Sequence, residues 1–288
     1  MTTTLLVLAT LAALVAAGFL KFRSLPTKRK KKLIKKSVAS FYQRIEDWGL
    51  VPRTPGFVAD YHRMYPGLEA LEKNHELVKR ECLDLLSRSG DLTDMRDMGG
   101  SYTQAGIHTA QWKTFMFKSG SFIEENCALA PETAQILRDI PDLYTAFFSV
   151  LAPHQYITPH WGYYKGFLRY HLGVIIPGDN AEQSCWLRVN DDRDDNLAKD
   201  RDRITRGVRY WWHEGEGVVF DDTYLHDAAN ESDQVRVVLW IDMLKPHPWY
   251  LQIVNRLFLW FAHRDRSVQK IRENALVTAP EPGERSGS

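Results

Sequence analysis

The second half of the chain consists of short apolar runs that are separated by turn-forming residues and not by helices. These runs are FFSVLAP at 147–153, RYHLGVIIP at 169–177, SCWLRVN at 184–190, GEGVVFDD at 215–222 and VRVVLWIDML at 235–244. Several short strands in succession are typical of a sandwich or a jelly roll. A chain of 288 residues with 44% apolar content is long enough to bury such a core and to add helices around it. We therefore expect a mainly β fold with flanking α-helices.

Helices are expected on both sides of this strand-rich part. Apolar side chains at helical spacing predict an amphipathic helix at 66–89 within a helical N-terminal region at 38–109, and PETAQILRD predicts a shorter helix from Pro131. A C-terminal helix is expected at 248–264, too short and too interrupted to span a bilayer. Its aromatic residues suit a membrane interface, but the helix can equally cover the sheet.

Two polar stretches are expected to lie outside the core. NDDRDDNLAKDRDRITRGVR, which begins at Asn190, is charged and poor in apolar residues. It predicts a long solvated hairpin, and we expect a passive insertion rather than a lid that touches substrate. Residues 278–288 have the composition of a disordered tail.

The N-terminus has the pattern of a membrane anchor. Residues 2–20 carry no charge, and at about 1.5 Å per residue a helix of this length just crosses a hydrocarbon layer of about 30 Å. Nine Lys or Arg residues follow between positions 21 and 36, and we expect 21–37 to be a basic juxtamembrane segment on the cytosolic side. A signal peptide is disfavoured because no positive charge precedes the apolar run.

The same basic block dominates the charge balance. It contributes +9 to a net charge of +1, so the rest of the chain carries −8 by difference. Cations that cluster beside a membrane span meet anionic lipid headgroups, and we expect no nucleic-acid partner. Cys82, Cys127 and Cys185 are far apart and lack CxxC spacing, so we expect small buried side chains and no zinc cluster.

Two histidines are the candidates for a metal site. On the strand at 169–177, His171 shares a face with Gly173, where many mononuclear iron oxygenases carry a carboxylate. Because Gly173 has no carboxylate, a metal site at His171 is either absent or of an unusual kind. His226 follows a strand and a turn, in a position from which a side chain can return to a barrel interior. Two neutral imidazoles inside a small jelly roll suit ferrous iron.

Arg236 stands ten residues after His226 in an otherwise apolar run. A buried cation is unfavourable unless an anion compensates it. The partner can be internal, Asp242 or Asp222. A planar guanidinium can instead bind a dicarboxylate such as 2-oxoglutarate in a bidentate manner.

Several motifs in order then resemble a known family. They are QWKTFMFKSG, FFSVLAPHQYITPHWGYYKGFLRYHLGVIIP, CWLRVND, EGEGVVFDDTYLH and RVVLWIDMLKP. Over residues 110–246 the chain resembles the aspartyl/asparaginyl β-hydroxylases, which are iron- and 2-oxoglutarate-dependent oxygenases. FDDTYLH is most similar to the membrane-bound lipid A 2-hydroxylase branch. The resemblance implies a double-stranded β-helix at 110–247, with Fe(II), 2-oxoglutarate and dioxygen as cofactors.

The resemblance also implies roles for individual residues. His171 and His226 match the iron ligands, and Arg236 matches the residue that holds the distal carboxylate of 2-oxoglutarate. Arg188 matches an arginine near the cosubstrate, and His160 matches a recurrent histidine for which we expect a pocket-lining role. Gly173 agrees with a two-histidine site in which water takes the third place, and an Asp there is expected to add a carboxylate to the iron.

Three functions remain open from the sequence. The leading hypothesis is an inner-membrane, single-pass hydroxylase with its catalytic domain in the cytosol, acting on carbon 2 of a lipid A acyl chain. The second keeps the chemistry but hydroxylates Asp or Asn in a peptide or protein. The third is a non-catalytic scaffold of the same fold. Retention of His171, His226 and Arg236 together counts against the scaffold.

Overall fold

The computed structural model describes residue 37 and residues 40–88, 92–97, 110–162, 164–263 and 266–277. The expected membrane segment, the basic segment apart from residue 37, and the tail at 278–288 lie outside the described residues. Within the described ranges, no helix has both the length and the apolar character needed to cross a bilayer. The chain divides into two compact units, residues 1–52 and 53–288, and the first contains a helix at residues 40–47.

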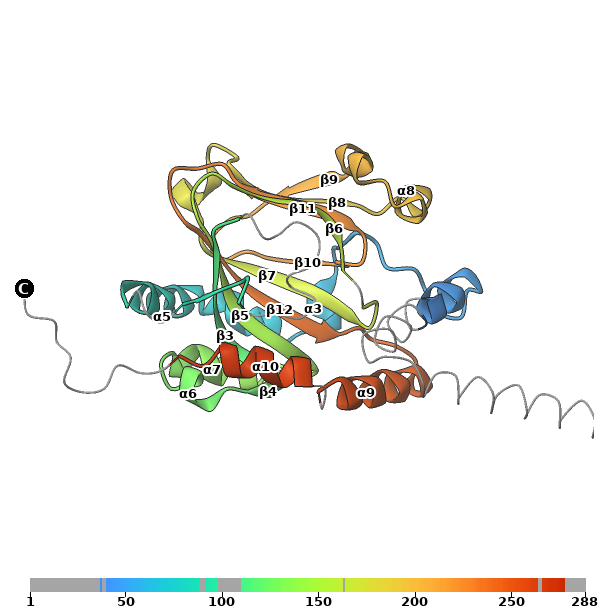
Figure 1. The fold of residues 1–288 in the computed structure, drawn as a ribbon, viewed down its shortest axis with the longest axis horizontal. Coiled ribbons are helices and arrows are strands. Elements are labelled where there is room, and N and C mark those ends of the chain that lie inside the picture. The colour runs from blue at the N-terminus through green and yellow to red at the C-terminus, as the bar shows by residue number, and fades with distance from the viewer. Residues whose placement is uncertain are drawn as a thin grey trace, which may run out of the picture. The chain divides into compact units, whose positions relative to one another are not determined.

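The second unit contains two antiparallel sheets that face each other (Figure 1). In spatial order, the large sheet consists of β1 (Phe57–Val58), β10 (Gly217–Phe220), β7 (Phe167–Ile175), β12 (Arg236–Leu244), β5 (Leu143–Leu151), β3 (Trp112–Ser119) and β2 (Thr93–Asp94), with β4 (Ser121–Phe122) paired to β3. The small sheet consists of β6 (Gln155–Trp161), β11 (Leu225–Asn230), β8 (Cys185–Asn190) and β9 (Val208–Trp211). Facing antiparallel sheets of this kind form a jelly roll, as the strand pattern predicted.

The large sheet is buried on both faces. All nine residues of β12 are buried, and they alternate between two apolar cores. Val238 and Trp240 pack into the core between the two sheets, whereas Leu239 and Ile241 pack into a core under the helices. Burial on both faces explains why the central strands read as continuous apolar runs and not as alternating ones.

Helices cover the outside of the large sheet and the edges of the sandwich (Figure 1). They are α3 (Tyr61–Met64), α4 (Leu68–Lys73), α5 (His75–Ser87), α6 (Glu124–Cys127), α7 (Pro131–Arg138), α8 (Arg193–Ala198), α9 (Trp249–His263) and α10 (Arg266–Asn274), with 3-10 helices η3 (Pro177–Asn180) and η4 (Arg201–Arg206). The shorter helix expected from Pro131 is confirmed as α7. The helix expected at 66–89 is two helices, because Asn74 leaves the helical region with φ −108° and ψ 24°.

The charged insertion after β8 connects the paired antiparallel strands β8 and β9 and is mostly exposed, as expected of a solvated hairpin connection, but it is folded into a lobe. The lobe contains α8 and η4, and Asp195 is buried within it. Its carboxylate accepts a hydrogen bond from Arg203 Nη1 at 2.6 Å. The side-chain oxygen of Asn196 accepts from Trp161 Nε1 at 2.9 Å and from the Leu225 amide at 2.8 Å. These bonds fix the lobe on β6 and β11.

The aromatic helix α9 has two different faces. Leu251, Asn255 and Leu259 are buried, and Asn255 Nδ2 donates to the carbonyl of Gly166 at 3.0 Å. The opposite face exposes large apolar side chains, namely Trp249, Tyr250, Ile253, Val254, Leu257 and Trp260. The helix therefore covers the protein with one face and presents an apolar stripe with the other.

Candidate active site

His171 and His226 point into the core between the two sheets. His171 lies on β7, directly opposite Trp240 of β12. His226 lies on β11, directly opposite Val189 of β8, which belongs to the same core. Their side chains are only 5% and 4% exposed. Strands that are far apart in the sequence thus bring both histidines into one buried space.

Aromatic rings surround the two histidines. The ring of His171 lies 5.0 Å from Trp240, 5.0 Å from Phe220 and 5.8 Å from Trp212, measured between centroids. Phe220 also lies 5.8 Å from His226 and therefore borders both imidazoles. These walls keep water away from the histidines and restrict how each ring can turn.

The ring nitrogens of both histidines suit a metal ligand. Neither nitrogen of His171 has a hydrogen-bond partner in the described part of the chain. In His226, Nδ1 lies 2.8 Å from the carbonyl oxygen of Tyr224, which leaves Nε2 as the free lone pair. Burial is the main cause that lowers the pKa of both side chains well below the usual histidine range. Both are therefore neutral near pH 7, the form that binds metals.

These residues fit an iron atom held by two protein side chains. Among the described residues, no three or more His, Cys, Asp or Glu side chains are arranged to hold a metal ion. Imidazole nitrogen is a good ligand for ferrous iron, and a site with few protein ligands leaves positions for cosubstrate and dioxygen.

His160 lies beside this pair. It is opposite His226 in the β6–β11 register, and the two ring centroids are 4.1 Å apart. Its Nδ1 lies 2.8 Å from the carbonyl oxygen of Thr158. Burial lowers the pKa of His160 to about 4, so this ring is also neutral. As a whole residue His160 is half-buried, whereas His171 and His226 are buried.

Arg236 is a buried cation with no anionic partner among the described residues. Only 2% of the residue is exposed, and its guanidinium carbon lies 4.6 Å from the centroid of the Trp212 ring. Its Nε has no hydrogen-bond partner, and no carboxylate of the described residues forms an ion pair with it. Burial lowers the pKa of Arg236 to about 10. Trp212 borders His171 as well, so Arg236 reaches the same space as the histidines.

The two aspartates considered as internal partners of Arg236 bind Arg169 instead, which overturns that alternative. Arg169 Nη1 lies 2.9 Å from Asp222, and its Nε lies 2.8 Å from Asp242. Its guanidinium carbon sits 3.8 Å from the ring centroid of Trp240, whose Nε1 donates to Asp242 at 3.2 Å. This network holds Trp240 against His171.

Gly173 is required by a close backbone approach. A Cβ at this position would lie 2.0 Å from the carbonyl oxygen of His213. The loop at 213–216 is bonded to the strand here, because the Gly215 amide donates to the Gly173 carbonyl at 2.9 Å. The expectation that Asp can be added at 173 is therefore wrong, since the backbone of His213 fills the place of the side chain.

Arg188 lies on the other face of the small sheet. It is opposite Asp227 in the β8–β11 register, whereas His226, one residue earlier, faces the core. Its guanidinium binds Asp227 in a bidentate manner at 3.0 and 2.6 Å, and Tyr156 donates to the same carboxylate at 2.6 Å. The structure does not bring Arg188 together with the histidines, which corrects its expected place near the cosubstrate.

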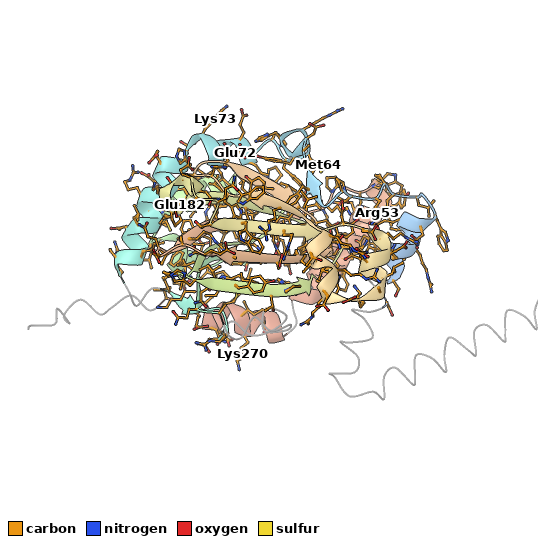
Figure 2. All side chains as sticks on the ribbon, turned by 90° about the horizontal axis from the view of Figure 1, so that it is seen from above. Arg53, Met64, Glu72, Lys73, Glu182 and Lys270 are labelled. Carbon is orange, nitrogen blue, oxygen red and sulfur yellow. The ribbon has the colours of Figure 1, made fainter. Side chains whose placement is uncertain are left out.

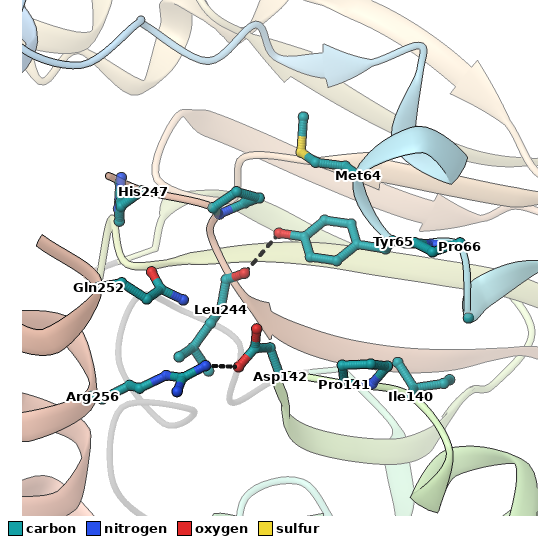
Figure 3. Close-up of a pocket in the computed structure, with 12 residues that line it drawn as sticks. Met64, Tyr65, Pro66, Ile140, Pro141, Asp142, Leu244, His247, Gln252 and Arg256 are labelled. Atoms are coloured by element: carbon teal, nitrogen blue, oxygen red, sulfur yellow. Dashed lines mark hydrogen bonds and ion pairs between the residues drawn. The ribbon is translucent and has the colours of Figure 1, made fainter. Parts of the chain in front are cut away.

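Two cavities lie away from the histidines. One, of about 320 Å³, lies between α3, β12 and α9; Figure 3 shows Tyr65 bonded to the Leu244 carbonyl and Arg256 paired with Asp142 inside it. The other, of about 460 Å³, lies on the outer face of the small sheet beside Arg188. Neither is lined by the two histidines or by Arg236.

Sequence reasoning assigned no role to Arg169. It also missed the aromatic walls formed by Trp212, Phe220 and Trp240. An aromatic residue in an apolar strand gives the same signal whether it fills a core or borders a site. Their role becomes visible only from the ring contacts.

This chain is similar in sequence to known proteins. A sequence model described as aspartyl/asparaginyl beta-hydroxylase matches residues 72–246. The ornithine lipid ester-linked acyl 2-hydroxylase of Rhizobium tropici is 33% identical over 192 residues, which cover 66% of this chain and 62% of that protein. The aspartyl/asparaginyl beta-hydroxylase of Homo sapiens is 24% identical over 190 residues, which cover 62% of this chain and 21% of that protein. The matched part of this chain thus spans less than two thirds of either relative.

Solved structures resemble this chain at lower sequence identity. The non-heme alpha ketoglutarate dependent carbocyclase SnoK superposes with a TM-score of 0.41 at 14% identity, over 78% of this chain and 85% of that one. A Pseudomonas putida prolyl-4-hydroxylase has a TM-score of 0.35 at 14% sequence identity, over 59% of this chain and 87% of that one. The family match covers more than half of the chain and includes the strands that carry both histidines. The chain therefore belongs to the aspartyl/asparaginyl beta-hydroxylase family.

Proposed function

We propose that this protein is an Fe(II)- and 2-oxoglutarate-dependent hydroxylase that acts on carbon 2 of a lipid acyl chain. The observation that carries the proposal is the buried space between the sheets. There, two neutral histidines with free ring nitrogens share aromatic walls with a buried arginine that has no anionic partner in the part of the chain that the structure describes. A scaffold has no use for an uncompensated buried cation, whereas an enzyme that binds a dicarboxylate does.

The residues divide the work as follows. His171 and His226 hold the iron, and Arg236 receives the distal carboxylate of 2-oxoglutarate, which compensates its charge. When bound, iron and 2-oxoglutarate supply the oxidation that puts one oxygen atom of dioxygen into a C–H bond and releases succinate and carbon dioxide. Trp212 and Trp240 exclude water, and the Arg169 network keeps Trp240 in place.

Two observations favour a lipid substrate. The Rhizobium tropici relative is an acyl 2-hydroxylase of ornithine lipid and matches this chain at 33% identity. In addition, α9 exposes an apolar stripe with two Trp and one Tyr, the residues that settle at the membrane–water interface. The uncharged segment at 2–20 and its basic flank give the chain a second contact with a membrane, with the catalytic unit on the cytosolic side.

Mass spectrometry of membrane lipids tests the proposed reaction. Cells that express the wild-type chain should contain lipid acyl chains with one additional oxygen, and fragmentation should place it on carbon 2. The His226→Ala variant, expressed at the same level, should leave these lipids unmodified. The choice between lipid A and an aminolipid substrate follows from which lipid class gains the oxygen. Unmodified lipids with the wild-type chain would refute the proposal.

Membrane contact through α9 can be tested separately. With brominated lipids in a bilayer around the full chain, quenching of tryptophan fluorescence should decrease in Trp249→Phe. Trp211→Phe, which changes a half-buried tryptophan on β9, is the matched control and should leave quenching unchanged. Equal quenching in both variants would show that the stripe does not enter the interface.

A second candidate function is hydroxylation of Asp or Asn in a peptide. The human relative carries this activity in its name and matches at 24% identity. Purified protein incubated with Asp- and Asn-containing peptides should then consume 2-oxoglutarate in step with peptide oxidation. If turnover responds to peptides and not to lipids, this second function replaces the first.

A further inference from the structure

Trp212 carries a buried hydrogen-bond donor that nothing in the described part of the chain satisfies. The residue lies just after β9, in the core between the two sheets, and is 0% exposed. Its Nε1 has no hydrogen-bond partner among the described residues. An unpaired buried N–H costs free energy, and such groups are few in folded proteins. A ligand that accepts a hydrogen bond from this indole removes that cost.

Two other tryptophans of the same core have acceptors. Trp112 Nε1 donates to the hydroxyl of Ser149 at 2.9 Å, and Trp240 Nε1 donates to Asp242 at 3.2 Å. The described residues thus supply an acceptor for both of these indoles but not for that of Trp212. The unpaired donor is therefore a local feature of the place where Trp212 lies.

The ring of Trp212 touches both parts of the proposed site. Its centroid lies 5.8 Å from that of His171 and 4.6 Å from the guanidinium carbon of Arg236. Arg236 is itself buried, and its Nε has no hydrogen-bond partner in the described ranges. Unpaired donors of two neighbouring side chains thus belong to one buried space. Such a pair suits a carboxylate, because each of its two oxygen atoms can accept.

Hydrogen bonds to the backbone hold Trp212 in place. Asn180, at the end of η3, is 2% exposed, and its Nδ2 donates to the carbonyls of Trp212 at 3.0 Å and Cys185 at 2.7 Å. Its Oδ1 accepts from the amide of Cys185 at 2.9 Å. One buried side-chain amide therefore joins η3, β8 and the segment that carries the indole. A donor that is fixed before its ligand arrives loses little freedom on binding.

We propose that the indole N–H of Trp212 donates a hydrogen bond to the distal carboxylate of 2-oxoglutarate, beside the guanidinium of Arg236. This inference rests on the proposed function. The indole N–H is already out of water in the ligand-free protein, so the new bond replaces none that it made to water. Trp212 then does more than exclude water. It makes the pocket prefer a dicarboxylate, because a 2-oxo acid without the distal carboxylate leaves the N–H unpaired.

Binding of two 2-oxo acids tests the donor. 2-Oxopentanoate has the carbon chain of 2-oxoglutarate but ends in a methyl group instead of the distal carboxylate. Calorimetry uses the full chain in a nonionic detergent with Zn²⁺ in place of iron, so that no turnover occurs. Trp212→Phe keeps an aromatic ring and loses the N–H. It should bind 2-oxoglutarate roughly tenfold to a hundredfold more weakly, because the lost bond has a charged acceptor. Its affinity for 2-oxopentanoate should stay unchanged.

Trp186→Phe is the matched control. Trp186 on β8 is 4% exposed, and its Nε1 likewise has no hydrogen-bond partner within the described ranges. Its ring centroid, however, lies 5.2 Å from the guanidinium carbon of Arg188, on the outer face of the small sheet, which is turned toward the viewer in Figure 2. This variant removes an equally buried donor at another place, so it should bind 2-oxoglutarate as the wild type does. Weaker binding would show that the effect of Trp212→Phe is not local.

Nuclear magnetic resonance separates a direct bond from an effect that acts through Arg236. The chain has nine tryptophans, and nitrogen-15 labelling gives each indole N–H a signal. With Zn²⁺ bound, one indole proton should move downfield when 2-oxoglutarate is added and stay in place with 2-oxopentanoate. This signal should be missing in Trp212→Phe. If no indole proton of the wild type moves in this way, the bond does not form, whether or not the variant folds.

The outcomes separate this inference from the proposed function. If the wild type with Zn²⁺ binds no 2-oxoglutarate, both are wrong. If the wild type and Trp212→Phe bind 2-oxoglutarate equally well, the donor role is wrong and the proposed function stands. If Trp212→Phe weakens the binding of both 2-oxo acids by the same factor, the ring is a wall of the pocket and not a donor.

Discussion

Arg236 gives the sharpest test, because its replacement should have opposite effects on stability and on ligand binding. The guanidinium is buried and pairs with no carboxylate of the described residues, and burial lowers its pKa to about 10 from the usual value of about 12.5. At about 1.4 kcal/mol per pKa unit, the difference corresponds to roughly 3 kcal/mol of unfavourable burial. A methionine of similar volume carries no such cost, since neutral substitutes for buried charges are often stabilising by about 1–4 kcal/mol.

We therefore expect Arg236→Met to raise the melting temperature of the ligand-free protein. For a unit of this size 1 kcal/mol corresponds to about 2–4 °C, so a gain of several degrees is expected. The wild type should gain stability when 2-oxoglutarate and a divalent metal are added, by about 2.7 kcal/mol at a hundred times the dissociation constant. Arg236→Met should lose this second gain, because each charge-assisted contact contributes about 1.5–3 kcal/mol.

Differential scanning fluorimetry with and without 2-oxoglutarate measures both effects in one experiment. Arg236→Lys is the control that keeps a cation, and it should retain part of the ligand response and none of the gain in stability. A lower melting temperature for Arg236→Met in the absence of ligand would show that the guanidinium is structurally compensated. An unchanged ligand response would assign the distal carboxylate to another residue.

Further expectations concern the iron ligands, the close backbone approach and a buried carboxyl group. His171→Ala and His226→Ala should each abolish oxygen-dependent turnover of 2-oxoglutarate while the circular dichroism spectrum stays unchanged. Turnover in both variants would show that these histidines are not the iron ligands. Gly173→Ala should lower stability by roughly 1–3 kcal/mol or more, because the new Cβ meets the His213 carbonyl; an unchanged urea midpoint would contradict this. Burial and neighbouring carboxylates raise the pKa of Asp222 to about 7, so the folded state keeps a proton that the unfolded state releases above about pH 4. The free energy of unfolding of the wild type should therefore fall as pH rises from 4 to 8, and that of Asp222→Asn should fall less. Equal slopes of unfolding free energy against pH would show that another group causes the decline.

The hydrophobic pattern predicted the central strands but not the edge of the small sheet. β5, β7 and β12 are buried on both faces, and continuous apolar runs identify such strands. β6 reads QYITPHW, carries a proline, and is mostly half-exposed, so it gives neither a continuous nor an alternating signal. Its pairing with β11 is nevertheless what places His160 beside His226.

The charges of the insertion after β8 predicted its exposure but not its two short helices, α8 and η4. Its acidic and basic residues have the composition of an exposed loop, yet Asp195 is buried and collects two arginines. In the turn between α8 and η4, Lys199 takes a left-handed conformation. Residue type at that position gives no hint of it.

Strand geometry argues against Asp242, which the sequence analysis had left open as a partner of Arg236. A strand rises about 3.3 Å per residue, so Asp242, six residues along β12, lies roughly 20 Å away and on the same face. No side chain bridges that distance. What the sequence could not supply is the register between strands, which places Asp242 directly opposite Arg169 of β7 and leaves Arg236 opposite Leu151 of β5. The same register sets Trp240 opposite His171, so one alignment of β12 positions the wall of the proposed iron site and leaves the guanidinium available for the carboxylate of the proposed cosubstrate.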